Sequence, residues 1–237
     1  MNISNRVVNR EDWIVARKAL LAKEKAFTRD RDALSAARRE LPMVKVEKSY
    51  VFEEPTGKRS LIDLFAGKRQ LVVYHFMFDP SWAAGCRSCS YVADNLSGAL
   101  IHLAARDTAF VAISRAPVAK IERFKTRMGW TFRWLSSFES DFNYDFGVSF
   151  RPDEVAEKRV DYNYEIQPFP VQEAHGISVL LRDGSDVFHT YSTYGRGVDL
   201  VMNTYNLLDM TPLGRQEEGL QFTMTWLRHH DDYESAP

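Results

Sequence analysis

The sequence predicts an α/β domain in which a mixed sheet is sandwiched by helices. Two apolar runs, 70–78 and 108–114, are rich in β-branched and aromatic residues, which is typical of central strands covered on both faces. A helical pattern follows each run, so the two strands are predicted to be parallel and joined by right-handed crossovers. A later hairpin pattern, 175–182 and 187–194 around the turn 183–186, adds antiparallel strands.

The 237 residues are enough for one large domain, or for one domain with extensions. Pro42 ends a long helical stretch, so residues 1–42 are predicted to form an N-terminal helical arm. Residues 43–209 then form the α/β domain, with an aromatic-rich insertion at about 138–173. Residues 210–237 are predicted to be a C-terminal extension.

Local signals place the remaining elements of the domain. These signals are turn residues, apolar residues at helical spacing, Pro117 at a helix start and Gly129 at a helix end. In chain order they predict an edge strand at 44–52, a turn at 53–58, a helical turn at 60–65 capped by Ser60, a helix at 86–106, a helix after Pro117, a short strand at 131–136 and a helix at 198–208.

Large apolar residues repeat every seven positions along the arm, after a helix cap predicted at Asn9. The helix would be roughly 45 Å long at about 1.5 Å per residue. Its apolar stripe is narrow and its other faces are charged, which argues against a membrane anchor. The arm either lies across its own domain or packs on a second copy, giving a homodimer. The stripe consists of Trp13, Leu20, Phe27, Leu34 and Leu41.

The formal net charge of -1 gives no general reason to expect nucleic-acid binding. No apolar stretch approaches the roughly 18 residues of a membrane span. The first 13 residues hold no apolar h-region, so no signal peptide is expected. We therefore expect a cytoplasmic protein with neither a nucleic-acid nor a membrane partner. In a reducing cytoplasm, a purely structural disulfide is disfavoured.

The only two cysteines, Cys86 and Cys89, follow the first buried run and a short turn, where the next helix begins. Thiolate rather than thiol attacks a disulfide. The free N–H groups at a helix N-terminus and the charge of Arg87 both favour the thiolate form of Cys86. Cys89 lies one turn further along, within reach for a disulfide. The pattern predicts that Cys86 attacks and Cys89 resolves.

Two other interpretations of the pair stay open. The cysteines could be buried and redox-inactive, or they could bind a metal. A closed zinc site needs four ligands, and the chain has no second cysteine pair. We therefore predict no metal and no bound cofactor. The polar run 229–232 near the C-terminus is expected to be a solvated tail, and His75 a core histidine.

Aromatic and arginine residues at predicted strand ends and turns are candidates for a substrate groove. In open α/β sheets such positions line the crevice at the carboxyl ends of the strands. Trp82 directly precedes the dithiol and would form a wall of this groove, although each candidate could equally serve packing or an ion pair. The others are Arg115, Trp130, Trp134, Tyr191, Tyr194 and Arg196.

The chain resembles the thioredoxin-like superfamily, and more narrowly a bacterial family of unknown function described as predicted dithiol-disulfide oxidoreductases. The resemblance implies a thioredoxin-like fold and a dithiol activity for most of the chain. The segments that carry it are 82–90, 114–117, 128–130, 140–147 and 189–197.

The chain departs from the resemblance at two positions. Ser178 stands where thioredoxins carry a cis-proline, so it is a further candidate for the substrate groove, and the substrate-docking edge is expected to be altered. Ala83 stands where peroxiredoxins carry a threonine that helps to position peroxide. We predict a thiol-disulfide oxidoreductase that acts on a disulfide-containing protein or a small thiol, with an electron donor that the sequence does not identify. The rivals are a peroxiredoxin-like thiol peroxidase and a non-catalytic redox-sensing or binding protein.

Overall fold

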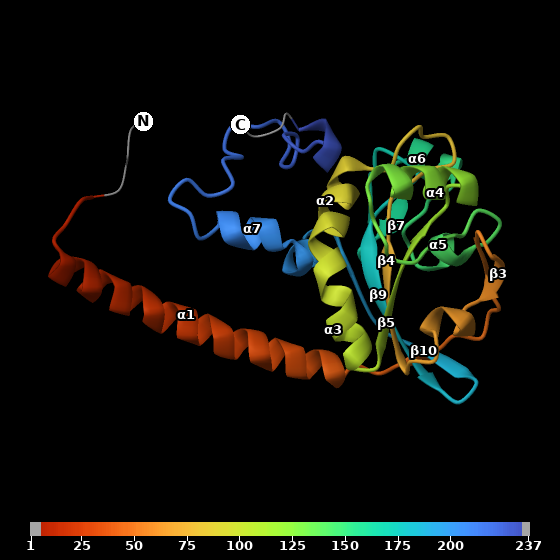
Figure 1. The fold of residues 1–237 in the computed structure, drawn as a ribbon, viewed down its shortest axis with the longest axis horizontal. Helices are drawn as coiled ribbons and strands as arrows, with labels where there is room; N and C mark the ends of the chain where they lie inside the picture. The colour runs from red at the N-terminus through yellow and green to blue at the C-terminus, as the bar shows by residue number, and fades with distance from the viewer. Residues whose placement is uncertain (1–5, 234–237) are drawn as a thin grey trace. The chain divides into compact units, whose positions relative to one another are not determined.

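The computed structural model describes residues 6–233, and the chain divides after Pro42 into two compact units. The described part of the first unit is built on one helix, α1 (Arg10–Arg39) (Figure 1). The side chain of Asn9 accepts a hydrogen bond of 2.8 Å from the N–H of Asp12, as the predicted cap requires. None of the residues of α1 is buried.

The second unit is built on an eight-stranded mixed sheet in the order β1-β10-β9-β4-β5-β6-β2-β3. Strands β4, β5 and β6 are parallel, and β9 and β10 form an antiparallel hairpin beside β4. This confirms the predicted mixed sheet, in which parallel strands are joined by an antiparallel hairpin. The strands are β1 (Val44–Lys45), β2 (Val51–Glu54), β3 (Gly57–Ser60), β4 (Gln70–His75), β5 (Thr108–Ser114), β6 (Trp134–Ser136), β9 (Gly176–Asp183) and β10 (Asp186–Tyr194).

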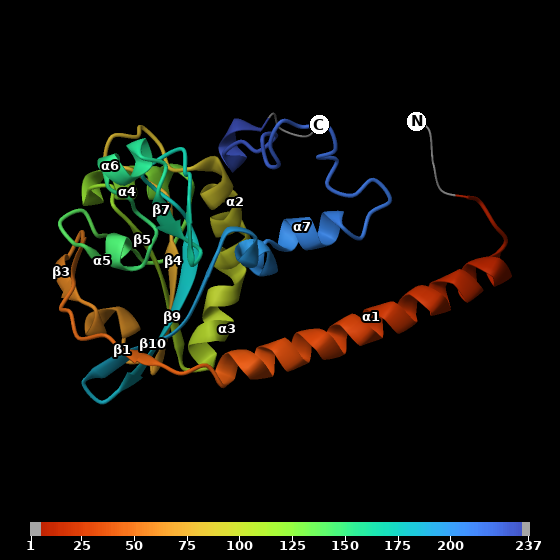
Figure 2. The same ribbon diagram turned by 180° about the vertical axis from the view of Figure 1, so that it is seen from behind.

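Helices cover both faces of this sheet. Figures 1 and 2 show α2 and α3 along one side of the strands and α5 on the other side. The helices of the unit are α2 (Arg87–Leu96), α3 (Leu100–Ala105), α4 (Val118–Arg127), α5 (Phe142–Asp145), α6 (Pro152–Ala156) and α7 (Asn203–Leu208), with the 3-10 turns η1 (Ile62–Phe65), η2 (Ser97–Ala99), η3 (Gly195–Val201) and η4 (His230–Asp232).

Strand β4 divides the core into two apolar clusters because its side chains alternate between the faces. Tyr74 packs with residues of α2, α4 and η3 on one face. Leu71 and Val73 pack with α5 and the insertion on the other face. Both neighbours of β4 lie in the sheet interior, so this strand is buried on both sides and its carboxyl end, at His75, is held in place.

The predicted edge strand at 44–52 is wrong. Its two ends pair at different places in the sheet: β1 adds to β10, whereas β2 adds to β6. The residues between them cross from one part of the sheet to the other, and polar contacts with Asp145 on α5 hold them there. The Lys48 ammonium lies 2.6 Å and the Tyr50 hydroxyl 2.8 Å from the Asp145 carboxylate. A local pattern of alternating residues does not distinguish one strand from two.

Two predicted helices are interrupted. The helix expected at 86–106 is formed by α2, η2 and α3, and the break falls at Ser97 and Gly98, which have low helix propensity. The helix expected at 198–208 is formed by η3 and α7. The insertion contains α5, α6 and a separate two-stranded sheet of β7 (Val160–Tyr162) and β8 (Glu165–Gln167).

Gly85 is packed against two buried rings directly before the dithiol. A Cβ atom at this position would lie 2.6 Å from Phe76 and 2.7 Å from Phe124, closer than packed carbon atoms approach. The rings belong to the cluster shared with α2, so they have little room to move. Only glycine therefore fits between the end of β4 and α4.

We predict that Gly85→Ala lowers the free energy of unfolding by about 1–3 kcal/mol because it overpacks this cluster. Gly98→Ala is the matched control, since a Cβ there meets open space. The control should leave stability unchanged or raise it by up to about 1 kcal/mol. Urea unfolding of both variants measures the difference, and equal stabilities would contradict the packing argument.

Candidate dithiol site

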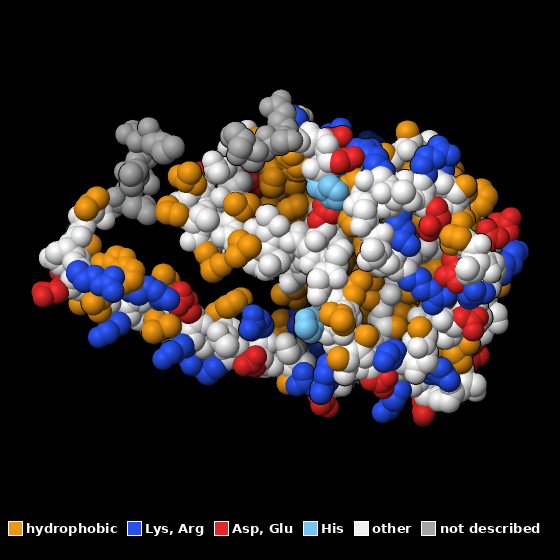
Figure 3. Space-filling view, viewed as in Figure 1, with side chains coloured by type: hydrophobic (Ala, Val, Ile, Leu, Met, Phe, Trp, Pro, Cys, Tyr) orange, Lys and Arg blue, Asp and Glu red, His pale blue; other side chains and the backbone are white. Residues whose placement is uncertain are grey.

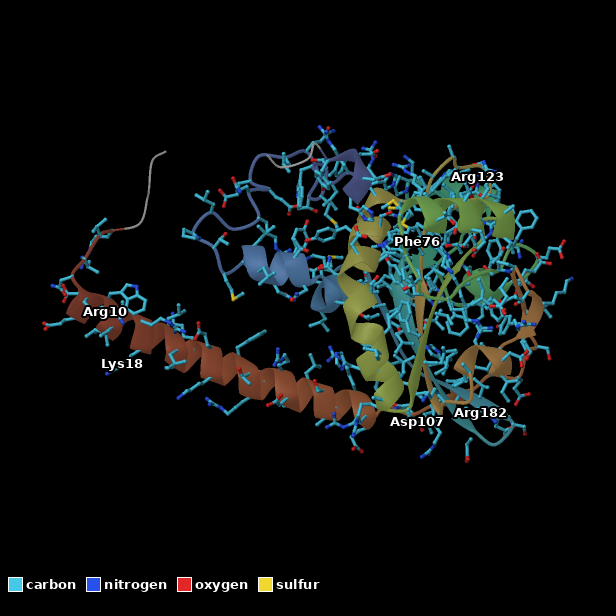
Figure 4. All side chains as sticks on the ribbon, viewed as in Figure 1. Arg10, Lys18, Phe76, Asp107, Arg123 and Arg182 are labelled. Atoms are coloured by element: carbon cyan, nitrogen blue, oxygen red, sulfur yellow. The ribbon has the colours of Figure 1, made fainter. Side chains whose placement is uncertain are left out.

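Cys86 lies at the beginning of α2, on the loop that leaves the carboxyl end of β4. It is the N-cap residue of the helix, and its carbonyl accepts the first helical hydrogen bond from the N–H of Ser90 at 2.9 Å. The N–H of Cys86 donates to the carbonyl of Met77 at 3.1 Å, which closes the loop onto the sheet. Figure 4 labels Phe76 at this end of the sheet, and Asp107 and Arg182 at the opposite end.

Cys86 is partly exposed, Cys89 is buried, and both are free thiols. The Cys89 thiol donates a hydrogen bond to the Cys86 sulfur, and this bond is the main influence that lowers the pKa of Cys86 to about 7. The N–H groups of Ser88 and Cys89 at the helix N-terminus act in the same direction, and burial opposes them. A large fraction of Cys86 is therefore thiolate at neutral pH.

Arg87 was predicted to tune this pKa. Its side chain is exposed, so solvent and salt screen its charge. The principal influences on Cys86 are the hydrogen bonds described above, among them one from the Ser88 hydroxyl. Ser88 has no local sequence signal for this role, because serine near a helix start is usually a simple cap.

Cys89, whose sulfur is buried, has a raised rather than a lowered pKa. Burial raises the pKa of Cys89 well above its usual value, and the neighbouring Cys86 raises it further. The Cys89 sulfur accepts a hydrogen bond from the N–H of Met77 at 3.4 Å. The pair thus combines one sulfur that ionises near neutral pH with one that stays protonated and in contact with it.

Two basic side chains that sequence reasoning missed hold the loop before Cys86. The Lys120 ammonium donates to the carbonyls of Pro80 and Trp82 at 2.5 and 3.1 Å. His229 Nε2 lies 2.9 Å from the carbonyl oxygen of Gly85. His229 is buried, so the prediction of a solvated tail is wrong at this residue: the C-terminal segment packs beside the dithiol loop. Neither contact has a local sequence signal.

The predicted groove residues lie in different parts of the domain and do not form one groove. Trp82 is half-buried and packs against the same cluster as Cys86. Trp130 is buried and its indole N–H donates to Asp94 on α2 at 2.7 Å, while Trp134 donates to the Ser114 hydroxyl. Both of these tryptophans are therefore core residues, and Trp82 is the aromatic candidate that lies on the dithiol loop.

The candidates on and after β10 lie elsewhere. Tyr194 is buried and donates to the carbonyl of Phe146 at 2.9 Å. Tyr191 is half-buried on β10, and Arg196 is exposed and paired with Asp199 at 3.1 Å. Tyr194 is therefore a packing residue rather than part of an open groove.

Ser178 does not lie at a docking edge. It is fully buried in β9, on the face of the sheet opposite α2, and its hydroxyl lies 2.8 Å from His75 Nε2 and 2.7 Å from the Ser192 hydroxyl. The prediction that it lines the groove is wrong, because strand alternation turns Ile177 rather than Ser178 toward the dithiol face. Burial lowers the pKa of His75 to about 3, so this core histidine is neutral.

Arg115 follows β5 and forms a buried ion pair. Its guanidinium lies 2.7 Å from the carboxylate of Glu173, which also accepts from the Ser149 hydroxyl at 2.8 Å. The Arg115 guanidinium stacks on Tyr144 as well. Burial raises the pKa of Glu173 to about 7 in spite of these partners. Arg115 thus joins the insertion to the sheet.

A separate cavity of about 510 Å³ lies against the opposite core cluster, between the segment 44–50, the end of α5 and β10. Its walls include Tyr50, Phe146 and His189, and no residue of the dithiol loop lines it. Across residues 6–233, no three His, Cys, Asp or Glu side chains are grouped so that they could hold a metal ion. No helix in the same range is long and apolar enough to cross a membrane.

The family model described as "Bacterial protein of unknown function (DUF899)" matches residues 2–233. The chain belongs to this family. The predicted membership of a bacterial family of unknown function is thereby confirmed. The comparison with curated proteins gave no match.

Among solved structures, the chain is similar to peroxidoxin BcpB from Mycobacterium tuberculosis, with 17% identity over 71% of this chain and 97% of that chain and a TM-score of 0.44. It is also similar to a cysteine-to-serine mutant of PrxQ from Xylella fastidiosa (12% identity, 70% and 94% covered, TM-score 0.44). A mitochondrial 2-cys peroxiredoxin from Plasmodium falciparum matches with 12% identity, 68% and 88% covered, and a TM-score of 0.41.

We predict that the rate of alkylation by iodoacetamide rises with pH with a midpoint near 7, because the thiolate of Cys86 is the reacting form. Cys89→Ala should raise this midpoint, since it removes the hydrogen bond with the largest effect, whereas Cys89→Ser keeps a donor and should raise it less. Arg87→Gln should change the midpoint least. Loss of label in Cys86→Ser identifies the reacting residue. A midpoint near the ordinary thiol value of about 8.5 in the wild type would contradict the assignment.

Proposed function

We propose that this protein is a thiol-disulfide oxidoreductase in which Cys86 is the attacking thiol and Cys89 the resolving thiol. The observation that carries the proposal is the partly exposed Cys86 at the N-cap of α2, with its pKa lowered to about 7 by the buried Cys89. A thiolate near its own pKa at neutral pH combines good nucleophilicity with a large ionised fraction.

The exchange takes two steps. The Cys86 thiolate attacks one sulfur of a substrate disulfide, a mixed disulfide forms, and the other substrate sulfur leaves as a thiolate that takes up a proton. Cys89 then attacks the Cys86 sulfur, the intramolecular disulfide forms, and the second substrate sulfur leaves. Two electrons pass from the dithiol to the substrate, so an external dithiol must reduce the protein again.

The substrate class follows from the exposure of the site. Cys86 is only partly exposed, and Trp82 on the same loop packs against the same core cluster, so a substrate disulfide is expected to approach along the loop 79–86. A disulfide-containing protein with an accessible bridge or a small disulfide both meet this requirement. A reducing cytoplasm, the compartment expected from the sequence, would keep both thiols free between turnovers.

We predict that the protein accelerates the reduction of insulin by dithiothreitol, and that Cys86→Ser abolishes the acceleration. With insulin and without dithiothreitol, which would itself resolve the adduct, Cys89→Ser should instead accumulate a mixed disulfide, because the resolving sulfur is gone. Non-reducing electrophoresis and mass spectrometry measure the adduct. Insulin reduction by Cys86→Ser at the wild-type rate would refute the assignment.

The same variants separate the rival functions. A thiol peroxidase would consume hydroperoxide in a Cys86-dependent manner faster than it reduces disulfides, and Ala83 offers no hydroxyl toward a bound peroxide. A redox sensor would oxidise once and show no turnover with dithiothreitol. Neither outcome is expected for the proposed oxidoreductase.

We also propose that α1 pairs with a second copy of the chain. Its apolar stripe is exposed, with Trp13 at 46%, Leu20 at 52% and Phe27 at 68% exposure. Most helical stability in proteins comes from the packing of an apolar face, so α1 gains stability when its stripe is covered. Exposed apolar side chains also gather around α7 and the segment after it, at Leu207, Met210 and Leu213 (Figure 3).

We predict a dimer in light scattering coupled to size-exclusion chromatography, and a shift toward monomer in Phe27→Glu. Val15→Glu is the control, because Val15 is as exposed as Phe27 but lies off the stripe. A wild-type mass of one chain would contradict the pairing. In that case, a lower melting temperature of Phe27→Glu would favour the alternative of an arm that packs on its own domain.

A further inference from the structure

Tyr74 carries a hydroxyl that has no hydrogen-bond partner in the described structure. Its side chain is 1% exposed and lies on β4, on the face that packs against α2. A buried hydroxyl without a partner destabilises the folded protein, a cost that phenylalanine at the same position would not carry. Such a group in a well-packed core calls for an explanation.

The group beside this hydroxyl is the buried sulfur of the dithiol. Tyr74 and Cys89 belong to the same apolar cluster, and an interaction with Cys89 follows burial among the influences that raise the pKa of Tyr74. In the other direction, a hydrogen bond from Tyr74 favours the ionised form of Cys89. The Cys89 sulfur has one further donor, the N–H of Met77.

This arrangement matters most after Cys86 has reacted. In the reduced protein the Cys89 thiol donates to the Cys86 sulfur. In the mixed disulfide Cys86 no longer carries a negative charge and no longer opposes the ionisation of Cys89, so burial remains as the influence that Cys89 must overcome to become the nucleophile. A developing thiolate in a buried site needs donors already in place. The N–H of Met77 already bonds this sulfur, and the unpartnered hydroxyl of Tyr74 is the second donor available to it.

We propose that Tyr74 is a catalytic residue of the resolving step, which rests on the proposed oxidoreductase function: its hydroxyl donates a hydrogen bond to the Cys89 sulfur as that sulfur ionises and attacks. The bond between Cys89 and Cys86 forms while the bond between Cys86 and the substrate sulfur breaks. The electron pair leaves on the substrate sulfur, which takes up the proton that Cys89 gives up. Tyr74 keeps its own proton throughout.

The test uses a disulfide reagent that reports the two steps separately. Ellman's reagent releases one coloured thiolate when Cys86 attacks and a second when Cys89 resolves the mixed disulfide. In Tyr74→Phe the first release should stay close to the wild-type rate, because the Tyr74 hydroxyl acts on the Cys89 sulfur, which does not attack in that step. The second release should slow by about 10–100-fold, the effect of losing one hydrogen bond to a charged group.

Tyr91→Phe is the matched control. Tyr91 also carries a buried hydroxyl without a partner in the same cluster, but on α2 and against Tyr205 and Trp226 rather than Cys89. Neither release should change in this variant. Thermal unfolding is measured alongside, and both phenylalanine variants should be at least as stable as the wild type because each removes an unpaired buried hydroxyl.

The outcomes separate the two proposals. A second release at the wild-type rate in Tyr74→Phe overturns the role of Tyr74 and leaves the dithiol function standing. Equal slowing of both releases also overturns it, because a general distortion of the site would act on both steps. Absence of a second release in the wild type overturns the proposed oxidoreductase function itself.

Discussion

The chemistry proposed for this protein depends on one hydrogen bond, from the buried Cys89 thiol to the partly exposed Cys86 sulfur. The bond favours the thiolate of Cys86 and at the same time holds the resolving sulfur in contact with the attacking one. Burial raises the pKa of both groups, but hydrogen-bond donors outweigh it at the partly exposed Cys86, whereas at the buried Cys89 it keeps the thiol protonated. The Cys86 sulfur is thereby activated for attack, while the Cys89 sulfur stays protonated until the second step.

The fold supplies the rigidity that this bond needs. Strand β4 is paired on both sides, and the N–H and carbonyl of Met77, just beyond its end, contact the two cysteines. The loop between Met77 and Cys86 is held by Lys120 from α4 and by His229 from the C-terminal segment. Elements that are distant in the sequence therefore contact the ten residues from Met77 to Cys86. A loop fixed in this way loses little further entropy when a substrate binds.

The sequence was sufficient for the elements with strong local signals. Strands β4 and β5, the hairpin of β9 and β10, and the start of α2 at the dithiol follow from apolar runs, turn residues and the cysteine spacing. The prediction of one strand over 44–52 was wrong because polar contacts with Asp145 carry the middle of this segment across the sheet, and no local pattern encodes those contacts. The prediction that Ser178 lines the groove was wrong because moving one residue along a strand turns the side chain to the opposite face of the sheet. Lys120 and His229 act through tertiary contacts alone, and the role proposed for Tyr74 depends on tertiary packing as well, so the sequence carries no local signal for any of them.

The most direct test of the account is the product of equilibration in a glutathione redox buffer, analysed by mass spectrometry of the intact protein after acid quenching. The account predicts that the oxidised protein loses two hydrogens and carries no glutathione, because Cys89 displaces it from Cys86 to form the internal disulfide. A stable adduct of one glutathione on Cys86, with Cys89 still a free thiol, would contradict it.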